Sequence, residues 1–137
     1  MSAVADVVLG ALMREGQVLL AHRSPEKRAH PDVWGLPGGC VEPGESELVA
    51  LARELHEELG VSITTGTASQ LYRLTAGPTD APVLVSAWMV VGWEGTPQNN
   101  APEEHVAIGW FGVDELPSPA HPQMRAAFLD ALRHVDG

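Results

Sequence analysis

The chain has few basic residues, and this shortage limits the partners that it can bind. Eight Lys and Arg stand against eighteen Asp and Glu, which gives a formal net charge of −10 at pH 7. Such an excess of negative charge opposes nonspecific attraction to the phosphate backbone of DNA or RNA. We therefore expect no nucleic-acid partner. A small phosphorylated ligand stays open, because divalent cations held by carboxylates reverse the local field.

Cysteine is almost absent. Cys40 is the only one in the chain, which excludes an intrachain disulfide and a zinc site built from several thiolates. A single cysteine fits either a nucleophile or a small packed residue. The packed residue is the simpler interpretation of Cys40.

Long apolar segments and internal repeats are also missing. Residues Met1–Asp6 carry no basic run, and the apolar segment Val7–Met13 that follows is too short to span a bilayer. We therefore expect a soluble, cytoplasmic protein without a membrane partner. No low-complexity tract interrupts the chain.

What the sequence does contain is enough apolar material for one packed core. Of its 137 residues, 45% are hydrophobic and 19% are charged, a composition typical of a folded globular protein. A chain of this length fits one compact domain. We expect a single domain over residues 1–137.

Apolar patterning and turn residues predict the secondary structure. Glu15-Gly16 suits a tight hairpin turn, and Trp34–Gly39 is rich in residues that permit unusual backbone angles. Strands, one central helix, more strands and a final helix predict an α+β fold, a layered α/β/α sandwich with a mixed sheet. The expected strands are Val4–Arg14, Gln17–Arg23, Leu71–Ala76, Val83–Gly92 and His105–Phe111, and the expected helices are Ser46–Leu59 and roughly Pro122–His134.

Acidic residues cluster near the end of the first expected helix. Glu54, Glu57 and Glu58 stand at i, i+3 and i+4, which makes them neighbours on one face. Like charges so placed destabilise an isolated helix by about 0.2–0.5 kcal/mol per pair, and they oppose the helix dipole. Carboxylate oxygens also suit Mg²⁺ or Mn²⁺. The cluster is therefore either a solvated acidic face or a metal site.

The residues around this cluster form a known pattern. From Gly39 the sequence has five residues, Glu45, seven residues and then Arg53-Glu54-Leu55-His56-Glu57-Glu58-Leu59-Gly60-Val61. It resembles the Nudix box, G-x5-E-x7-R-E-U-x-E-E-x-G-U with U aliphatic, at every specified position. The flanks Trp34–Gly39 and Trp110–Pro117 are also similar to the MutT-like Nudix hydrolase family. The resemblance implies the Nudix fold over residues 4 to 134.

The resemblance implies a role for each acidic residue of the box. Glu54, Glu57 and Glu58 match the glutamates that bind divalent metal, with Glu54 and Glu58 as the first candidates. The expected ion is Mg²⁺, for which Mn²⁺ can substitute. Arg53 and Glu45 match an ion pair that braces the box and orients the ligands, although a surface salt bridge that contributes little stability is the alternative.

Two glycines and three larger residues are candidates for ligand contacts. By resemblance, the carbonyl of Gly38 joins the metal shell, or the residue serves a structural turn. Gly39 lets the backbone approach substrate phosphates. Arg23 is a candidate for phosphate, and Trp34 and Tyr72 for stacking on a base; packing or surface exposure is the alternative for each.

The general base has two possible origins in Nudix enzymes. It comes either from the box, here Glu57 or Glu58, or from a later loop. Glu104 stands six residues before Trp110, a spacing similar to that of the loop glutamate in some relatives, and Glu103 is the second choice. An ordinary charged loop is the alternative.

The family chemistry predicts the function. We expect metal-dependent cleavage of a phosphoanhydride bond in a nucleoside triphosphate or nucleoside diphosphate derivative, with oxidised or noncanonical nucleotides as a first test set. A Nudix-fold module that binds or senses a nucleotide without cleaving it is the alternative, which the complete glutamate set disfavours. A homodimer is compatible with the family.

Four histidines and three tryptophans receive no catalytic role. The histidines lack the spacing of metal ligands: His22, His30, His56 and His105. The tryptophans are expected to pack between the sheet and the helices: Trp88, Trp93 and Trp110.

Overall fold

The computed structural model describes residues 4–27 and 31–135. The helices in this part of the chain are α1 (Glu47–Leu59), α2 (Pro122–Val135) and a short 3-10 turn (Thr65–Thr67). The strands are β1 (Val7–Arg14), β2 (Gln17–Arg23), β3 (Trp34–Gly35), β4 (Gly38–Cys40), β5 (Ser62–Ile63), β6 (Ala68–Ala76), β7 (Val83–Val90), β8 (Trp93–Glu94) and β9 (His105–Gly112).

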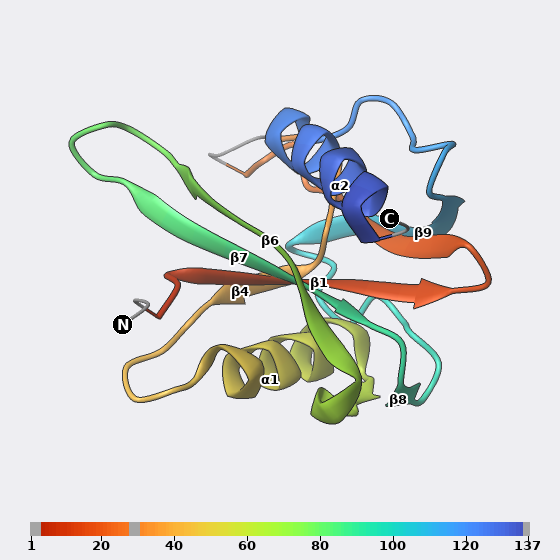
Figure 1. The fold of residues 1–137 in the computed structure, drawn as a ribbon. Coiled ribbons are helices and arrows are strands. Elements are labelled where there is room, and N and C mark those ends of the chain that lie inside the picture. The colour runs from red at the N-terminus through yellow and green to blue at the C-terminus, as the bar shows by residue number, and fades with distance from the viewer. Residues whose placement is uncertain (1–3, 28–30, 136–137) are drawn as a thin grey trace.

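A mixed sheet forms the centre of the molecule. Its strand order is β3-β2-β1-β7-β6, while β4 pairs with β1 and β9 pairs with β2. Strand β1 runs parallel to β7 and antiparallel to β2 and β4. Helix α1 covers one face of the sheet and α2 covers the other (Figure 1). The predicted layered α/β/α sandwich with a mixed sheet is confirmed.

Alternation along β1 divides the core between the two helices. Val8 and Leu12 belong to a buried cluster that includes Leu51 and Leu55 of α1. Ala11 points to the opposite face, where a second cluster contains residues of α2. Side chains of a strand alternate between faces with a period of two, so one strand contributes to both layers. The three tryptophans of the expected set, Trp88, Trp93 and Trp110, are partly buried against the α1 side.

The hairpin and the ends of α1 follow the predicted signals. Glu15 and Gly16 both have positive φ, 52° and 77°, as a tight hairpin turn requires. Helix α1 begins one residue later than predicted, because Ser46 is its N-cap and accepts from the backbone N–H of Val49. Gly60 ends the helix in the left-handed conformation, with φ 72°.

Four predicted strand ends were wrong. Strand β6 begins at Ala68 instead of Leu71, and β9 ends at Gly112 instead of Phe111. At the other two ends, side chains take backbone N–H groups. Strand β1 begins at Val7 instead of Val4: the N–H of Ala5 donates to the Glu47 carboxylate at 3.0 Å, and the carboxylate of Asp6 accepts from the N–H of Leu84 at 2.8 Å. Strand β7 ends at Val90 instead of Gly92, because the hydroxyl of Thr67 accepts the Gly92 N–H at 3.0 Å. Local side-chain acceptors thus replace strand partners.

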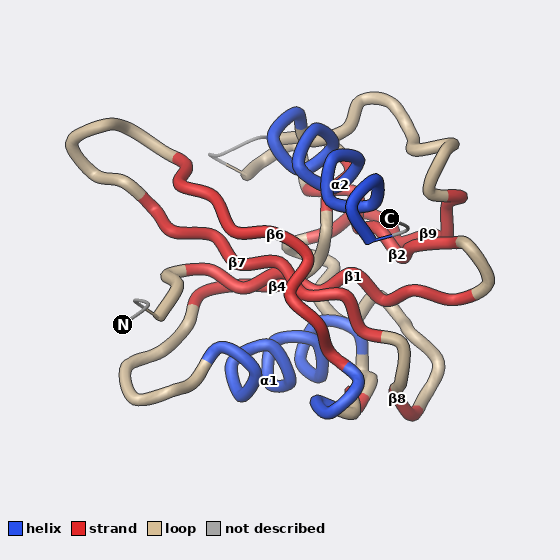
Figure 2. Tube along the Cα trace, in the orientation of Figure 1, coloured by secondary structure: helices blue, strands red, loops and turns tan. Residues whose placement is uncertain are grey.

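One loop closes the C-terminal end of α1. The N–H of Gln98 donates to the carbonyl of Leu59 at 2.9 Å, and the N–H of Asn100 donates to that of Glu58 at 2.8 Å. The loop satisfies carbonyls that a helix end leaves open. It then leads into β9, which lies beside β2 on the α2 side of Figure 2. No helix in the described ranges is long and apolar enough to cross a membrane.

Candidate active site

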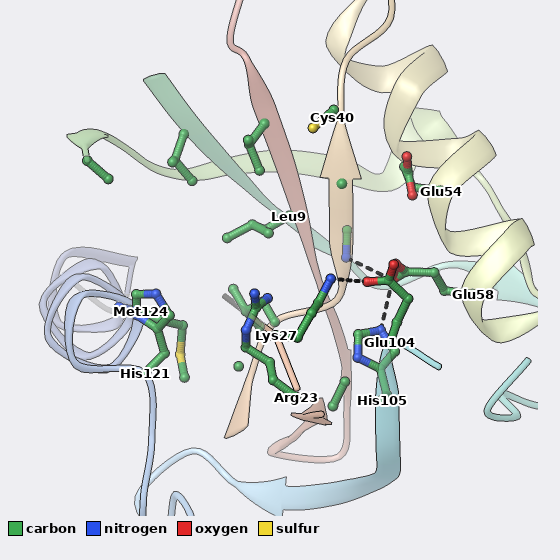
Figure 3. A pocket seen from close by; sticks show the side chains of 18 of the residues that line it. Leu9, Arg23, Lys27, Cys40, Glu54, Glu58, Glu104, His105, His121 and Met124 are labelled. Carbon is green, nitrogen blue, oxygen red and sulfur yellow. Dashed lines mark hydrogen bonds and ion pairs between the residues drawn. The ribbon is translucent and has the colours of Figure 1, made fainter. Parts of the chain in front are cut away.

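A cavity of about 790 Å³ lies between α1, β4, the β6–β7 hairpin and the start of α2. Figure 3 shows Glu54 and Glu58 pointing from α1 toward β4, with His105 next to Glu58 and residues of α2 across the opening. We call two parts of its lining the acidic side and the apolar side. The acidic side consists of Glu54, Glu57, Glu58, Glu103 and Glu104, and the apolar side consists of Leu9, Tyr72, Leu74, Val85 and Met124.

Arg53 braces the acidic side from outside the cavity. Its Nε and Nη2 donate to the two carboxylate oxygens of Glu45, both at 2.8 Å, and its Nη1 donates to Glu54 at 3.0 Å. Nη2 also donates to the carbonyl of Cys40 in β4 at 3.1 Å. Hydrogen bonds from Arg53 and from the N–H of Glu42 lower the pKa of Glu45 to about 2. The pair expected from the motif is therefore present and ties α1 to β4.

The surroundings of Glu54 make the negative charge of its carboxylate unfavourable. Burial raises the pKa of Glu54; a hydrogen bond from Arg53 acts against this rise, while the negative charges of Glu58 and Glu57 reinforce it. The carboxylate lies against Gly39, where an added Cβ would come within 2.5 Å of it. Gly39 therefore makes room for Glu54. Its predicted contact with substrate stays a prediction.

Glu58 is held more tightly than Glu57. The side chain of Glu58 is 9% exposed and that of Glu57 is 58% exposed. Oε1 of Glu58 accepts from the backbone N–H of Gly38 and from Nε2 of His105, each at 3.2 Å. At Gly38 a Cβ would lie 2.0 Å from the carbonyl oxygen of Val8. Only glycine allows β4 to approach β1 so closely and to present this N–H.

Glu104 faces a cation across the cavity entrance. Its carboxylate forms a hydrogen-bonded ion pair with Nζ of Lys27, the only lysine of the chain. Its carbonyl accepts from the N–H of Ser24 at 3.0 Å. The hydrogen bond from Lys27 lowers the pKa of Glu104 despite partial burial. Glu104 is thus a paired carboxylate of the acidic side, with Glu103 next to it.

The predicted ligand contacts divide into two groups. Arg23, Gly38, Gly39 and Tyr72 line the cavity. Burial raises the pKa of Tyr72, which keeps its phenol neutral. Trp34 does not appear among the described lining residues; it stacks on His22 with ring centroids 4.8 Å apart and meets an edge of the Phe111 ring. Its predicted role in base stacking therefore has no support from this placement.

Several lining residues were missed in the sequence. His105 touches Glu58, although its spacing suggested no role. His121 and Gln123, at the start of α2, and Asn100 in the loop before β9 also reach the cavity. The only signal for His105 was its position beside Glu104. His30 lies outside the described residues.

The acidic side fits a divalent cation of the magnesium type. Among the described residues no three acidic, histidine or cysteine side chains already surround one point. Mg²⁺ is usually held by one or two carboxylates with waters and substrate phosphates, so a complete protein cage is not required. The carboxylate of Glu54, whose charge its surroundings make unfavourable, and the hard oxygen donors of Glu57 and Glu58 match this chemistry.

Comparisons with known proteins agree with this geometry. The family model described as NUDIX domain matches residues 1–132. The CTP pyrophosphohydrolase of Escherichia coli (strain K12) is 37% identical over 133 residues, which cover 93% of each chain. The 8-oxo-dGTP diphosphatase of the same organism is 27% identical over 119 residues, which cover 85% of this chain and 91% of that protein.

The fold has a close match among solved structures. The crystal structure of a MutT NUDIX hydrolase from Burkholderia pseudomallei superposes with a TM-score of 0.82 and 28% identity, over 93% of this chain and 98% of the other. The chain belongs to the NUDIX domain family, and it is a pyrophosphohydrolase of the Nudix type.

Proposed function

We propose that this protein hydrolyses a nucleoside triphosphate to a nucleoside monophosphate and pyrophosphate, with Mg²⁺ as cofactor and Mn²⁺ as a substitute. One observation carries the proposal: a single cavity joins carboxylates of the Nudix box, two cationic side chains and an apolar wall. The carboxylates can hold metal ions, the cations can contact phosphates, and the apolar wall can contact the nucleobase. A nucleoside diphosphate derivative is the second substrate class.

The acidic side would hold the cofactor. Nudix hydrolases generally depend on divalent metal. Glu54 and Glu58 are the first candidate ligands, Glu57 is the third, and the carbonyl of Gly38 is a further donor. When bound, such an ion neutralises phosphate oxygens and makes water a better nucleophile. In its absence the three glutamates repel one another.

Positive charge comes from β2 and the loop after it. Arg23 and Lys27 line the cavity, and Lys27 reaches Glu104 beside Glu58 (Figure 3). Their side chains suit the outer oxygens of a polyphosphate, which carries more negative charge than one cation neutralises. Glu104 would hold Lys27 in place while the ammonium of Lys27 contacts a phosphate oxygen.

The proton of the attacking water needs an acceptor on the acidic side. Glu58 is fixed by two hydrogen bonds on one oxygen, and Glu57 is close to it on the helix. Glu104 is engaged by Lys27, and this ion pair holds the pKa of Glu104 down in the free protein. We propose a box glutamate as the base and Glu104 as a positioning group.

The apolar side suits the nucleobase and sugar. Leu74 and Val85 are direct neighbours across the β6–β7 ladder, and Tyr72 offers an aromatic ring with a neutral hydroxyl. The relatives' names supply the first substrates to test. CTP comes from the relative that covers 93% of this chain, and 8-oxo-dGTP comes from the second.

A substrate panel tests the proposal. The purified chain is incubated with CTP, dCTP, 8-oxo-dGTP, dGTP and ADP-ribose, each with Mg²⁺, with Mn²⁺ and with excess chelator, and both products are quantified. We expect a monophosphate and pyrophosphate in equal amounts from a triphosphate, and background turnover with chelator. Full turnover in chelator would refute the metal requirement, and cleavage of ADP-ribose alone would refute the triphosphate assignment.

A homodimer, a cytoplasmic location and the absence of a nucleic-acid partner stay predictions. So does the extent of one domain over residues 1–137. Sedimentation of the purified chain at several concentrations tests the first of these.

A further inference from the structure

The loop before β9 and the first residue of β9 together hold Glu58 at two places. The N–H of Asn100 donates to the main-chain carbonyl of Glu58 at 2.8 Å. Five residues later, Nε2 of His105 meets Oε1 of the Glu58 carboxylate at 3.2 Å. One short segment therefore fixes both the backbone and the side chain of the same glutamate.

His105 itself has little freedom to move. Its side chain is 5% exposed. Its carbonyl accepts from Nδ2 of Asn99 at 2.7 Å, and its N–H donates to the carbonyl of Ala101 at 3.0 Å. The residue also pairs with Arg23 in the β2–β9 ladder. A buried imidazole anchored on both sides of its backbone keeps a fixed direction toward α1.

The contact defines which nitrogen carries hydrogen. An ionised carboxylate only accepts, so Nε2 must donate to Glu58. Nδ1 is buried and has no hydrogen-bond partner in the described part of the chain. A second N–H at Nδ1 would be buried without an acceptor, which is costly. The contact therefore requires a hydrogen on Nε2, and Nδ1 has no acceptor for a hydrogen of its own.

The two donors act on one oxygen of Glu58. Nε2 of His105 and the N–H of Gly38 both reach Oε1. No hydrogen bond to Oε2 is found among the residues that the structure describes. Among the described residues, a carboxylate held in this way has one oxygen without a hydrogen bond, and the two contacts restrain its rotation about the last side-chain bond.

We propose that His105 is the positioning residue of Glu58: its Nε2–H and the Gly38 N–H occupy Oε1 and leave Oε2 to the ligand in the cavity. The inference rests on the proposed metal-dependent hydrolysis, because Oε2 is useful only toward a cation or a reacting water. Partners that orient ligating carboxylates strengthen metal binding, and their loss typically costs about 10–100-fold in affinity or activity.

Side chains of different length at position 105 distinguish a role in positioning Glu58 from a role in packing alone. His105→Gln places an amide N–H near the position of Nε2, whereas His105→Asn is polar but too short to reach Glu58. His105→Leu fills a similar volume without a donor. His22→Leu is the matched control, because His22 pairs with Asp32 and stacks on Trp34, outside the cavity.

Two measurements are made on each folded variant, with circular dichroism and thermal melting as the folding check. The first is the Kd for Mn²⁺ in the nucleotide-free protein, measured by electron paramagnetic resonance. The second is kcat at saturating Mn²⁺. We expect His105→Asn and His105→Leu to raise the Kd by about 10–100-fold, His105→Gln to restore most of the affinity, and His22→Leu to match the unmodified protein.

Equal Mn²⁺ affinity in all four folded variants would overturn the inference. So would a His105→Gln protein as impaired as His105→Asn, since packing alone would then explain the losses. If His105→Leu does not fold, the comparison of Gln with Asn still decides.

A measurement without metal keeps this inference separate from the proposed function. Nitrogen NMR of the imidazole should show the tautomer with hydrogen on Nε2, and Glu58→Gln should shift that nitrogen signal. An unmodified protein that neither binds Mn²⁺ nor cleaves nucleotides would refute the proposed function, and the NMR result would then decide the contact alone. Absence of this tautomer would refute the role of His105.

Discussion

The acidic side and the apolar side of the cavity are built in different ways. The half-buried Glu54 and the buried Glu58 each have a fixed partner: Glu54 has Arg53, and Glu58 has Gly38 and His105. The apolar side combines strand residues such as Leu74 and Val85 with Met124 of α2, and these apolar side chains pack without directional bonds. Directional contacts fix the positions of charges, whereas packing fixes only a shape.

This difference separates what each side controls. A charge displaced by a fraction of an ångström changes transition-state stabilisation, so the acidic side should govern kcat. A wall of partly exposed aliphatic groups binds substrate and transition state alike, so the apolar side should govern KM and substrate preference. Mutations on the two sides test this division.

The largest effect is expected on the acidic side. Glu58→Gln keeps the size and the helix propensity of residue 58 but removes its charge, so kcat should fall by about 100- to 10,000-fold, the range typical of lost proton transfer. The fold should survive, as circular dichroism would show. Steady-state kinetics with CTP and Mg²⁺ measures the loss. A near-native kcat of Glu58→Gln at low metal concentration would refute the proposed role of Glu58 in metal binding and catalysis.

Glu104→Gln provides the contrast within the acidic side. If Glu104 only positions Lys27, Glu104→Gln should lower kcat less than Glu58→Gln does. The dependence of kcat on Mg²⁺ concentration should stay almost unchanged. A fall in kcat equal to that of Glu58→Gln, again with unchanged metal dependence, would instead identify Glu104 as the base.

A smaller effect is expected on the apolar side. Leu74→Ala removes aliphatic surface from a half-buried wall, and each buried CH₂ is worth about 0.8 kcal/mol; we expect KM to rise about fivefold with little change in kcat. Thr75→Ala is the control, because Thr75 is next to Leu74 but its exposed side chain points to the other face of β6. A large loss of kcat in Leu74→Ala would break the division between the two sides.

The sequence predicted the acidic side better than the apolar side, and the reason is physical. Glu54, Glu57 and Glu58 meet through helical spacing, a local property that needs no knowledge of the rest of the chain. Gly60 is local in the same sense, as a helix end. The order of strands and helices also follows from local periodicity, which is why the layered fold was predictable.

The missed features depend on contacts between distant residues. His105 reaches Glu58 only because β9 pairs with β2 and its preceding loop caps α1. Trp34 turns away from the cavity because His22, its neighbour across the β2–β3 ladder, offers a stacking partner. The pair of Lys27 and Glu104 joins two loops of no regular structure. Neither residue spacing nor composition predicts such contacts between residues far apart in the sequence.

The smallest expected effect concerns the brace behind the acidic side, and it disappears in acid. The folded-state pKa of Glu45 is about 2, below the ordinary value of 4.5, because Arg53 and the Glu42 N–H hydrogen-bond its carboxylate. A pKa lowered by folding contributes stability that is present above pH 4.5 and is lost as the pH falls toward 2. Glu45→Gln should therefore be less stable than the unmodified protein at neutral pH, and the two stability curves should converge between pH 4.5 and 2. Urea titrations across this range measure the difference, and Glu94→Gln, at an exposed position on β8, is the matched control. A constant difference at every pH would show that Glu45 acts through packing and that the brace is not electrostatic.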